Sequence, residues 1–162
     1  SYDEYLSKKK VCIIASFADL TNKRISQINN SLIVIPDDYI GTGEQVEGLI
    51  KRLLEKGVKK ENIVVVALYI MKEGLDKLKG MKVKCFFHEV LDKAFGDTKK
   101  GIREKALLKQ ISNKLGIAED ICLGRNDSQA LIVLNRVPNN TLAIFYDSGK
   151  GPLKRNAMFP RN

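Results

Sequence analysis

The chain has 162 residues, of which 44% are hydrophobic, and a formal net charge of +9. This length suits one domain with a real core, and no apolar run approaches the roughly 18 to 20 residues of a membrane span. The opening residues, SYDEYLSKKK, lack the apolar stretch of a secretory signal, so we expect a cytoplasmic protein without a membrane segment.

The positive charge has two interpretations, which are contact with nucleic acid and general attraction of anionic nucleotides. The lysines are dispersed along predicted helix faces, without the interleaved aromatic residues that stack on bases. Nucleic-acid contact is therefore the weaker interpretation.

The cysteines and the histidine do not suggest a metal site. Cys12, Cys85 and Cys122 are odd in number and far apart, which is typical of reduced thiols rather than disulfides or zinc ligands. His88 follows an apolar run, and we interpret it as a strand-end or core residue.

The first part of the chain alternates between predicted strands and helices. Apolar runs predict strands over 11–15, 31–36, 62–70 and 83–88, and the run over 62–70 is typical of a central strand covered on both faces. Apolar spacing of three and four predicts helices over 44–56, with a stop at Gly57, and over 73–79. This order predicts an α/β fold with a mainly parallel, doubly wound sheet.

The second part has a different texture. We expect a helical turn over 91–95, a basic amphipathic helix over 101–115, and strands over 130–134 and 142–146 that form a hairpin. The apolar contacts expected of the basic helix are Ile102, Leu107, Leu108 and Ile111. The prediction is one domain over 1–162, with a core at about 10–90 and a C-terminal helix and β-hairpin addition at about 91–162.

Candidate functional residues concentrate in the stretch SLIVIPDDYIGTGEQV, residues 31–46. An apolar strand is expected to end at Asp37 and Asp38, and a glycine loop then leads into a helix at about Glu44. Glycines allow close approach of a ligand, and the free N–H groups of a helix start favour an anion. This order suits a sugar phosphate, with the acids binding hydroxyls or Mg²⁺. An ordinary strand-to-helix turn is the alternative.

This stretch resembles the ribose-phosphate signature of the type I phosphoribosyltransferases. The resemblance implies that Asp37 and Asp38, as catalytic residues, hold the ribose of phosphoribosyl pyrophosphate together with Mg²⁺. It also implies a loop that binds the 5′-phosphate, in which Gln45 replaces the usual second threonine. The implied loop residues are Gly41, Thr42, Gly43, Glu44 and Gln45.

The second half resembles the phosphoribosyltransferase-like domains of bacterial conflict systems, including those that accompany retrons. The resemblance rests on LGRNDSQALIVLNRVPNNTLAIFYDSG and the closing MFPR. It implies that Ser128, Asn139, Asn140 and Arg161 are further pocket residues, although a structural turn explains the asparagine pair equally well. Ser16 begins the segment that corresponds to the pyrophosphate loop of the family, but residues 16–30 are too few for its usual mobile hood.

Three functions follow from these patterns. The first is a phosphoribosyltransferase, or an enzyme that cleaves a nucleotide's ribosyl bond, acting as an effector of anti-phage defence with a defence-system partner. The second is a catalytically inactive nucleotide-sensing or complex-forming domain. The third, supported by charge alone, is a nucleic-acid-bound protein. No residue stands out as a general base.

Overall fold

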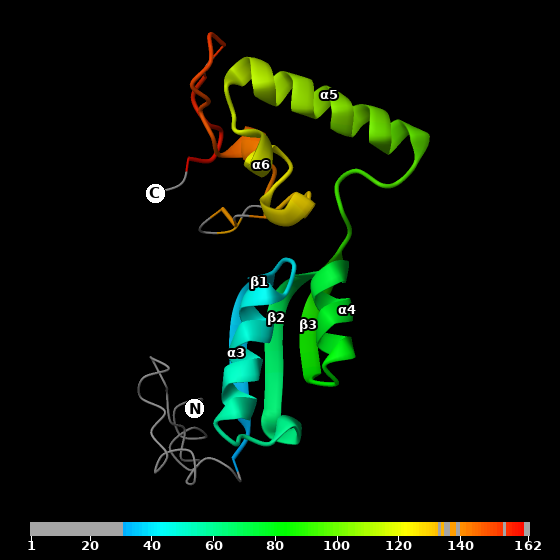
Figure 1. Ribbon diagram of the computed structural model, residues 1–162, viewed down its shortest axis with the longest axis vertical. Coiled ribbons are helices and arrows are strands. Elements are labelled where there is room, and N and C mark those ends of the chain that lie inside the picture. Colours follow the sequence, from blue (N-terminus) through cyan, green and yellow to red (C-terminus); the bar gives the residue numbers. More distant parts are fainter. Residues whose placement is uncertain (1–30, 133, 135–136, 139, 154, 161–162) are drawn as a thin grey trace, which may run out of the picture.

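The computed structural model describes residues 31–132, 134, 137–138, 140–153 and 155–160. The strand predicted over 11–15 and the candidate residues Ser16, Asn139 and Arg161 lie outside these residues. Figure 1 shows an elongated arrangement in which a sheet with two helices lies below and a long helix with the C-terminal segment lies above.

Three parallel strands form the sheet, in the order β1-β2-β3. They are β1 (Ile33–Ile40), β2 (Ile63–Met71) and β3 (Lys84–Leu91), joined by helices α3 (Glu44–Glu55) and α4 (Lys72–Gly80). The predicted parallel α/β fold is confirmed, because each strand is joined to the next by a helix. Gly57, with φ of 86°, lies where the stop of the first helix was expected.

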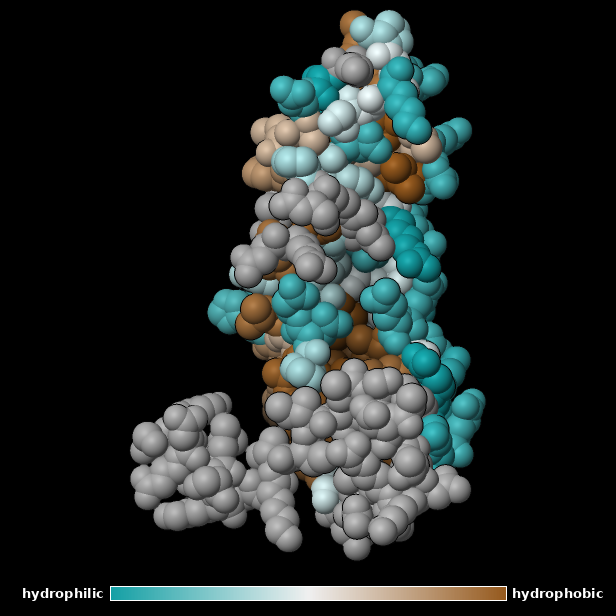
Figure 2. All heavy atoms as spheres, turned by 90° about the vertical axis from the view of Figure 1, so that its left-hand side faces the viewer, coloured by the Kyte–Doolittle hydropathy of each residue, from teal (hydrophilic) through white to brown (hydrophobic). Residues whose placement is uncertain are grey.

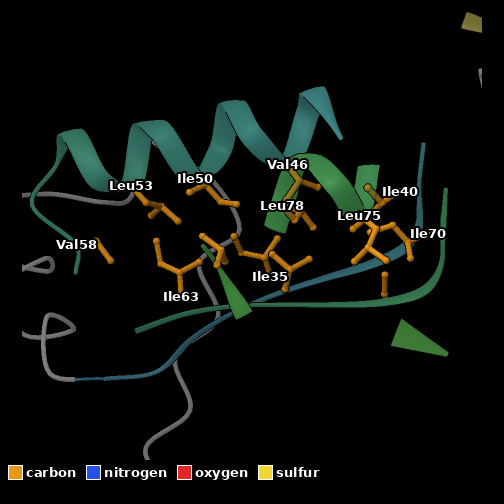
Figure 3. Close-up of a cluster of buried hydrophobic side chains, with 13 residues drawn as sticks. Ile35, Ile40, Val46, Ile50, Leu53, Val58, Ile63, Ile70, Leu75 and Leu78 are labelled. Carbon is orange, nitrogen blue, oxygen red and sulfur yellow. The ribbon is translucent and has the colours of Figure 1, made fainter. Parts of the chain in front are cut away.

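The core lies between the sheet and its helices, which both pack on one face (Figure 3). Val46, Ile50 and Leu53 follow one another at helical spacing, so α3 presents a continuous apolar stripe to the strands. The strands contribute alternate residues, such as Ile63 and Val65 of β2, because successive side chains point to opposite faces.

The opposite face of the sheet is apolar but more exposed in the described structure. Val34 is 50% exposed and Phe86 is 62% exposed, and Figure 2 shows hydrophobic residues at the surface of the lower half of the molecule. Within the central strand, Val66 and Leu68 are also exposed. The prediction that this strand is covered on both faces is therefore wrong for these two residues, since no described helix packs over them.

Strand β1 extends further than the sequence predicts. The expected end was Pro36, but pairing with β2 continues from Asp37 and Ala67 to Ile40 and Ile70. The proline is tolerated because β2 is the only strand paired with β1 in the described residues, and a missing N–H costs little on an unpaired edge. The acidic pair consequently lies inside the strand, near its carboxyl end.

The upper part is organised by the long helix α5 (Lys99–Leu115). This helix begins two residues earlier than the sequence predicts. Thr98 caps it, because its Oγ1 accepts a hydrogen bond from the amide of Gly101 at 3.1 Å. Gly116, with φ of 70°, ends it as expected. The short helix α6 (Glu119–Cys122) follows, and Leu108, Leu115, Cys122 and Leu142 are part of a second apolar cluster.

Other expectations for the upper part are wrong. The helical turn expected over 91–95 does not form, because Leu91 ends β3 and the following residues are irregular. Of the apolar contacts expected for α5, Leu108 is buried, whereas Ile102, Leu107 and Ile111 are exposed. The helix packs through a narrower stripe than predicted, since α6 and the C-terminal segment cover only one side of it.

The predicted hairpin strands do not form in the described residues. Ala130 makes a single isolated bridge with Thr141, and Ala143–Phe145 is a 3₁₀ turn. The apolar pattern is still used for burial, because Ala130 and Leu142 are both buried. A side-chain hydrogen bond replaces part of the missing strand pairing, because the Thr141 hydroxyl donates to the carbonyl of Ile132 at 2.9 Å.

The two parts meet at the carboxyl ends of the strands. Tyr39 of β1, Met71 at the end of β2 and Ala130 form a third buried cluster, against which Ile132 also packs. This contact places Ala130, Ile132 and Leu134 over the edge of the sheet where ligands bind in parallel α/β folds. No described helix is long and apolar enough to cross a membrane.

The core predicts a large difference between two identical substitutions. Ile50 is fully buried in the core, so we expect Ile50→Ala to lower the free energy of unfolding by about 2–5 kcal/mol. Ile102 is 60% exposed on α5, so Ile102→Ala should change it by less than about 0.5 kcal/mol. Denaturant titration of both variants measures this, and equal losses would contradict the assigned core.

Candidate functional site

A cavity of about 470 Å³ opens where β1 ends and α3 begins. This volume lies within the range of about 300–1,000 Å³ that is usual for small-molecule sites. The seven residues that the sequence predicts to bind ribose and phosphate, which are Asp37, Asp38 and Gly41 to Gln45, all line it, together with residues of the upper part. The lining residues are Asp37, Asp38, Tyr39, Ile40, Gly41, Thr42, Gly43, Glu44, Gln45, Val46, Arg125, Val137, Pro138 and Asn140.

The loop between β1 and α3 is held by close backbone packing. Gly43 has φ of 75°, a left-handed conformation that glycine adopts without strain. A methyl group on Gly41 would overlap the side chain of Asn140, and one on Gly74 of α4 would overlap the carbonyl oxygen of Gly41. The loop therefore touches both α4 and the upper part of the molecule.

The N-cap of α3 carries no side chain that could accept hydrogen bonds from the first amides of the helix. Gly43 occupies this N-cap position. These amides and the positive end of the helix dipole lie at the cavity, an arrangement that favours phosphate. The first turn is fixed to α4, because Glu47 pairs with Lys77 of α4 at 3.3 Å. Glu47 also pairs with Lys51 of the same helix at 2.7 Å.

The acidic pair lies at one side of the cavity. Asp37 is partly buried, whereas its neighbour Asp38 is exposed. Burial raises the pKa of Asp37, the charge of Asp38 raises it further, and a hydrogen bond from the amide of Tyr39 opposes the shift. A cation or a ligand hydroxyl beside these carboxylates would relieve the repulsion between them.

The upper part completes the cavity. The Asn126 side chain donates a hydrogen bond to the Glu44 carboxylate at 2.9 Å, which links the turn Arg125–Asp127 to the first residue of α3. Asn140 lies against Gly41, and its backbone carbonyl accepts a hydrogen bond from the Ser128 hydroxyl at 2.7 Å. Residues far apart in the sequence therefore form one site.

The structure distributes the predicted pocket residues unequally. Asn140 lines the cavity, whereas Ser128 is buried behind it and supports the backbone of Asn140. Sequence reasoning missed Arg125, Val137 and Pro138, which also line the cavity. For Arg125, the available signal was its position in the turn-forming run GRND, within the stretch that carries the second resemblance.

The histidine and the described cysteines lie apart from this cavity. His88 is an exposed residue of β3 rather than a core residue, and its ring meets that of Tyr69 edge to face at 6.1 Å. Cys85 and Cys122 are free thiols, and Cys12 lies outside the described residues. Three or more histidine, cysteine or acidic side chains do not gather into a metal-binding group anywhere in the described residues.

The fold and the cavity define a phosphoribosyltransferase-like α/β domain. The chain belongs to the PRTase-CE family, whose sequence pattern matches residues 1–161. No curated protein and no solved structure shows a significant match to the chain. The resemblance to phosphoribosyltransferases is thus confirmed at the level of the family.

The glycine contact predicts opposite effects for two substitutions in α4. Gly74→Ala would push a methyl group into the Gly41 carbonyl, so we expect a loss of about 1–3 kcal/mol in stability. Gly80→Ala meets open space and should leave stability unchanged or raise it by up to about 1 kcal/mol. Thermal unfolding compares them, and a Gly74→Ala protein as stable as the Gly80→Ala protein would disprove the close approach.

The raised pKa of Asp37 predicts that the free energy of unfolding depends on pH. A carboxyl whose pKa is higher in the folded state stabilises the fold fully below its unfolded pKa, and this contribution is lost as the pH rises through the folded pKa. At pH 7 the Asp37 carboxylate is ionised and partly buried, which lowers the stability of the folded state. Asp37→Asn removes this charge and should therefore unfold at a higher temperature than the unaltered protein. The difference should shrink as the pH falls through the Asp37 pKa. Asp76→Asn, on the exposed side of α4, is the control and should show neither effect.

Proposed function

We propose that this protein binds a ligand containing ribose 5-phosphate, either phosphoribosyl pyrophosphate or a nucleotide, in the cavity at the end of β1. One observation carries the proposal: the acidic pair and the uncapped start of α3 line the same cavity. Asp37 and Asp38 would accept hydrogen bonds from the ribose hydroxyls. The amides of Gly41 to Gln45 would bind the 5′-phosphate, and the side chain of Gln45 can add a donor.

Mg²⁺ is proposed to enter with the ligand. Mg²⁺ is usually held by one or two carboxylates together with phosphate oxygens and waters, and the adjacent Asp37 and Asp38 supply such carboxylates. The bound ion would neutralise the repulsion between these acids and an anionic ligand.

The proposed reaction class is transfer or hydrolysis at the anomeric carbon of the ribose. Positive charge develops on the sugar in such reactions, and carboxylates held beside it stabilise that charge. Asp37 and Asp38 are therefore the proposed catalytic residues. The biological context proposed is an effector of bacterial anti-phage defence in the cytoplasm, of the retron-associated kind, which the second-half resemblance and the family support.

A second candidate is a domain that binds the same ligand without turnover, as a nucleotide sensor or a component of a complex. Gln45 in place of the usual threonine favours it, as does the tie between Glu44 and Asn126, which occupies a carboxylate that could act as a base. Association with nucleic acid is a further alternative and is supported by the net charge of +9.

Ligand-induced thermal stabilisation tests the binding proposal. With Mg²⁺ and phosphoribosyl pyrophosphate at about 100 times the dissociation constant, the stability should rise by about 2.7 kcal/mol, which is about 5–10 °C for a chain of this size. Asp38→Asn should lose most of this shift, and Asp76→Asn should keep it. Failure of phosphoribosyl pyrophosphate and a panel of nucleotides to shift the melting temperature would refute the proposal.

Product analysis separates the two candidates. The enzyme is expected to release pyrophosphate or free base from one of these ligands, and Asp37→Asn should lower the rate by at least about 100-fold, as removal of one charge-stabilising group does elsewhere. A ligand that binds and stabilises the fold without any product would favour the sensor. The salt dependence of nucleic-acid binding tests the third function, which a flat dependence would contradict.

A further inference from the structure

Strand β3 forms one edge of the described sheet. Within the described residues it pairs with β2 alone, and Figure 1 shows it on the side of the sheet opposite β1. In a strand that pairs on one side, alternate residues point their N–H and C=O groups away from the partner strand. In the part of the chain that the structure describes, these backbone groups of β3 therefore face no other strand.

The side chains of β3 are exposed on both faces of the sheet. Phe86 is 62% exposed on the face without a described helix, which we call the open face. Phe87 is 39% exposed on the face that carries α3 and α4. Natural proteins usually block or cover an apolar strand at a sheet edge, because it can pair with another chain.

The two edges of the described sheet differ in the residues that discourage pairing. In β1, Pro36 lacks an N–H group, and Asp37 and Asp38 follow it directly. Strand β3 contains no proline, and its register with β2 continues without a bulge from Lys84 to Leu91. The edge of β3 is therefore suited to pairing with a further strand.

The residues on the open face of β3 form a pattern that complements itself when reversed. His88 lies at the centre, with Phe86 two positions before it and Val90 two positions after it. Lys84 lies four positions before His88, and Asp92, which directly follows the strand, lies four positions after it. A basic residue thus begins the pattern, an acidic residue ends it, and an apolar residue lies on each side of the centre.

A second copy of this chain, in antiparallel orientation, meets this pattern with complementary groups. A two-fold axis normal to the sheet keeps the open faces of both copies on the same side, so opposed residues come from the same face. With His88 on the axis, Lys84 lies opposite the partner's Asp92, and Phe86 lies opposite the partner's Val90. Opposite charges and apolar pairs at such positions stabilise antiparallel strands.

The neighbouring registers are less favourable. An axis at Glu89 would place that residue opposite its own copy, and like charges directly opposite each other are destabilising. An axis at Phe87 would place Lys84 opposite the partner's Val90, so the charge would have no opposed acid. The charges of the strand therefore favour the register about His88.

We propose that two copies of this chain associate edge to edge through β3, in antiparallel register about His88, so that the sheet continues from one copy into the other. The residues of β3 do not line the cavity, so this inference is independent of the proposed function. A contact made by one strand of each copy is small, and we expect a dissociation constant of about 1–100 μM.

Sedimentation of the full chain between about 1 μM and about 1 mM tests this inference. The unaltered protein should change from monomer to dimer over this range. Lys84→Glu and Asp92→Lys each create two like-charged pairs per dimer, so each should weaken dimerisation by about 10- to 30-fold. The variant with both substitutions exchanges the charges and should return to within about 3-fold of the unaltered protein.

A cross-link tests the register. His88→Cys places two thiols opposite each other on the axis, close enough for a disulfide after small adjustments. Oxidation should give a covalent dimer whose linked peptides join position 88 of one copy to position 88 of the other. In Val90→Cys the two new thiols are too far apart along the strands, so this control should give little covalent dimer.

Further controls make the outcomes distinct. Arg103→Glu makes the same change of charge on the exposed side of α5 and should leave dimerisation unchanged. Unchanged melting temperatures of the single variants at low concentration would show that the fold is intact. A chain that stays monomeric up to about 1 mM overturns the inference. A dimer that neither charge reversal weakens also overturns it, since such a dimer would use another surface.

Discussion

The close approach of Gly74 to the Gly41 carbonyl is the constraint on which the site depends. It sets the distance between α4 and the loop that precedes α3, so the loop turns sharply at the end of β1. Any side chain at Gly74 would lift the loop toward Asn140, which already fills the space above Gly41. The loop and the start of α3 are therefore held against α4 by a backbone contact between two glycines.

Much of the lower part could be predicted from the sequence because its signals are local. Apolar spacing in α3 and the continuous apolar run of β2 reflect how each element buries its own residues. The end of β1 was misplaced because Asp37 and Asp38 look like a strand end, and only the pairing with β2 shows otherwise. Burial also depends on the neighbouring elements, which is why the exposure of Leu68 was not predicted.

The upper part was harder to predict for the same physical reason. Ala130 and Leu142 have the apolar pattern of short strands, but they are buried through a bridge and a 3₁₀ turn whose geometry depends on distant contacts. Arg125 could not be assigned to the cavity from the sequence, since its place depends on a hydrogen bond between Asn126 and Glu44, which are 82 positions apart. Local patterns identified the glycine loop between β1 and α3 as a candidate site, and only the tertiary structure identified which residues face it.

The separation of the apolar clusters has a consequence for how this protein acquires its site. The cluster under the sheet uses residues between Ile33 and Cys85, the cluster of the upper part uses residues from Phe95 onward, and they share no member. Each cluster can condense around contacts that are near in sequence, which favours rapid folding. The cavity forms only when the two are docked through Tyr39 and Ala130, so ligand binding reports on the assembly of the whole chain. A nascent chain that ends before α5 would bury its sheet core and still lack a complete site.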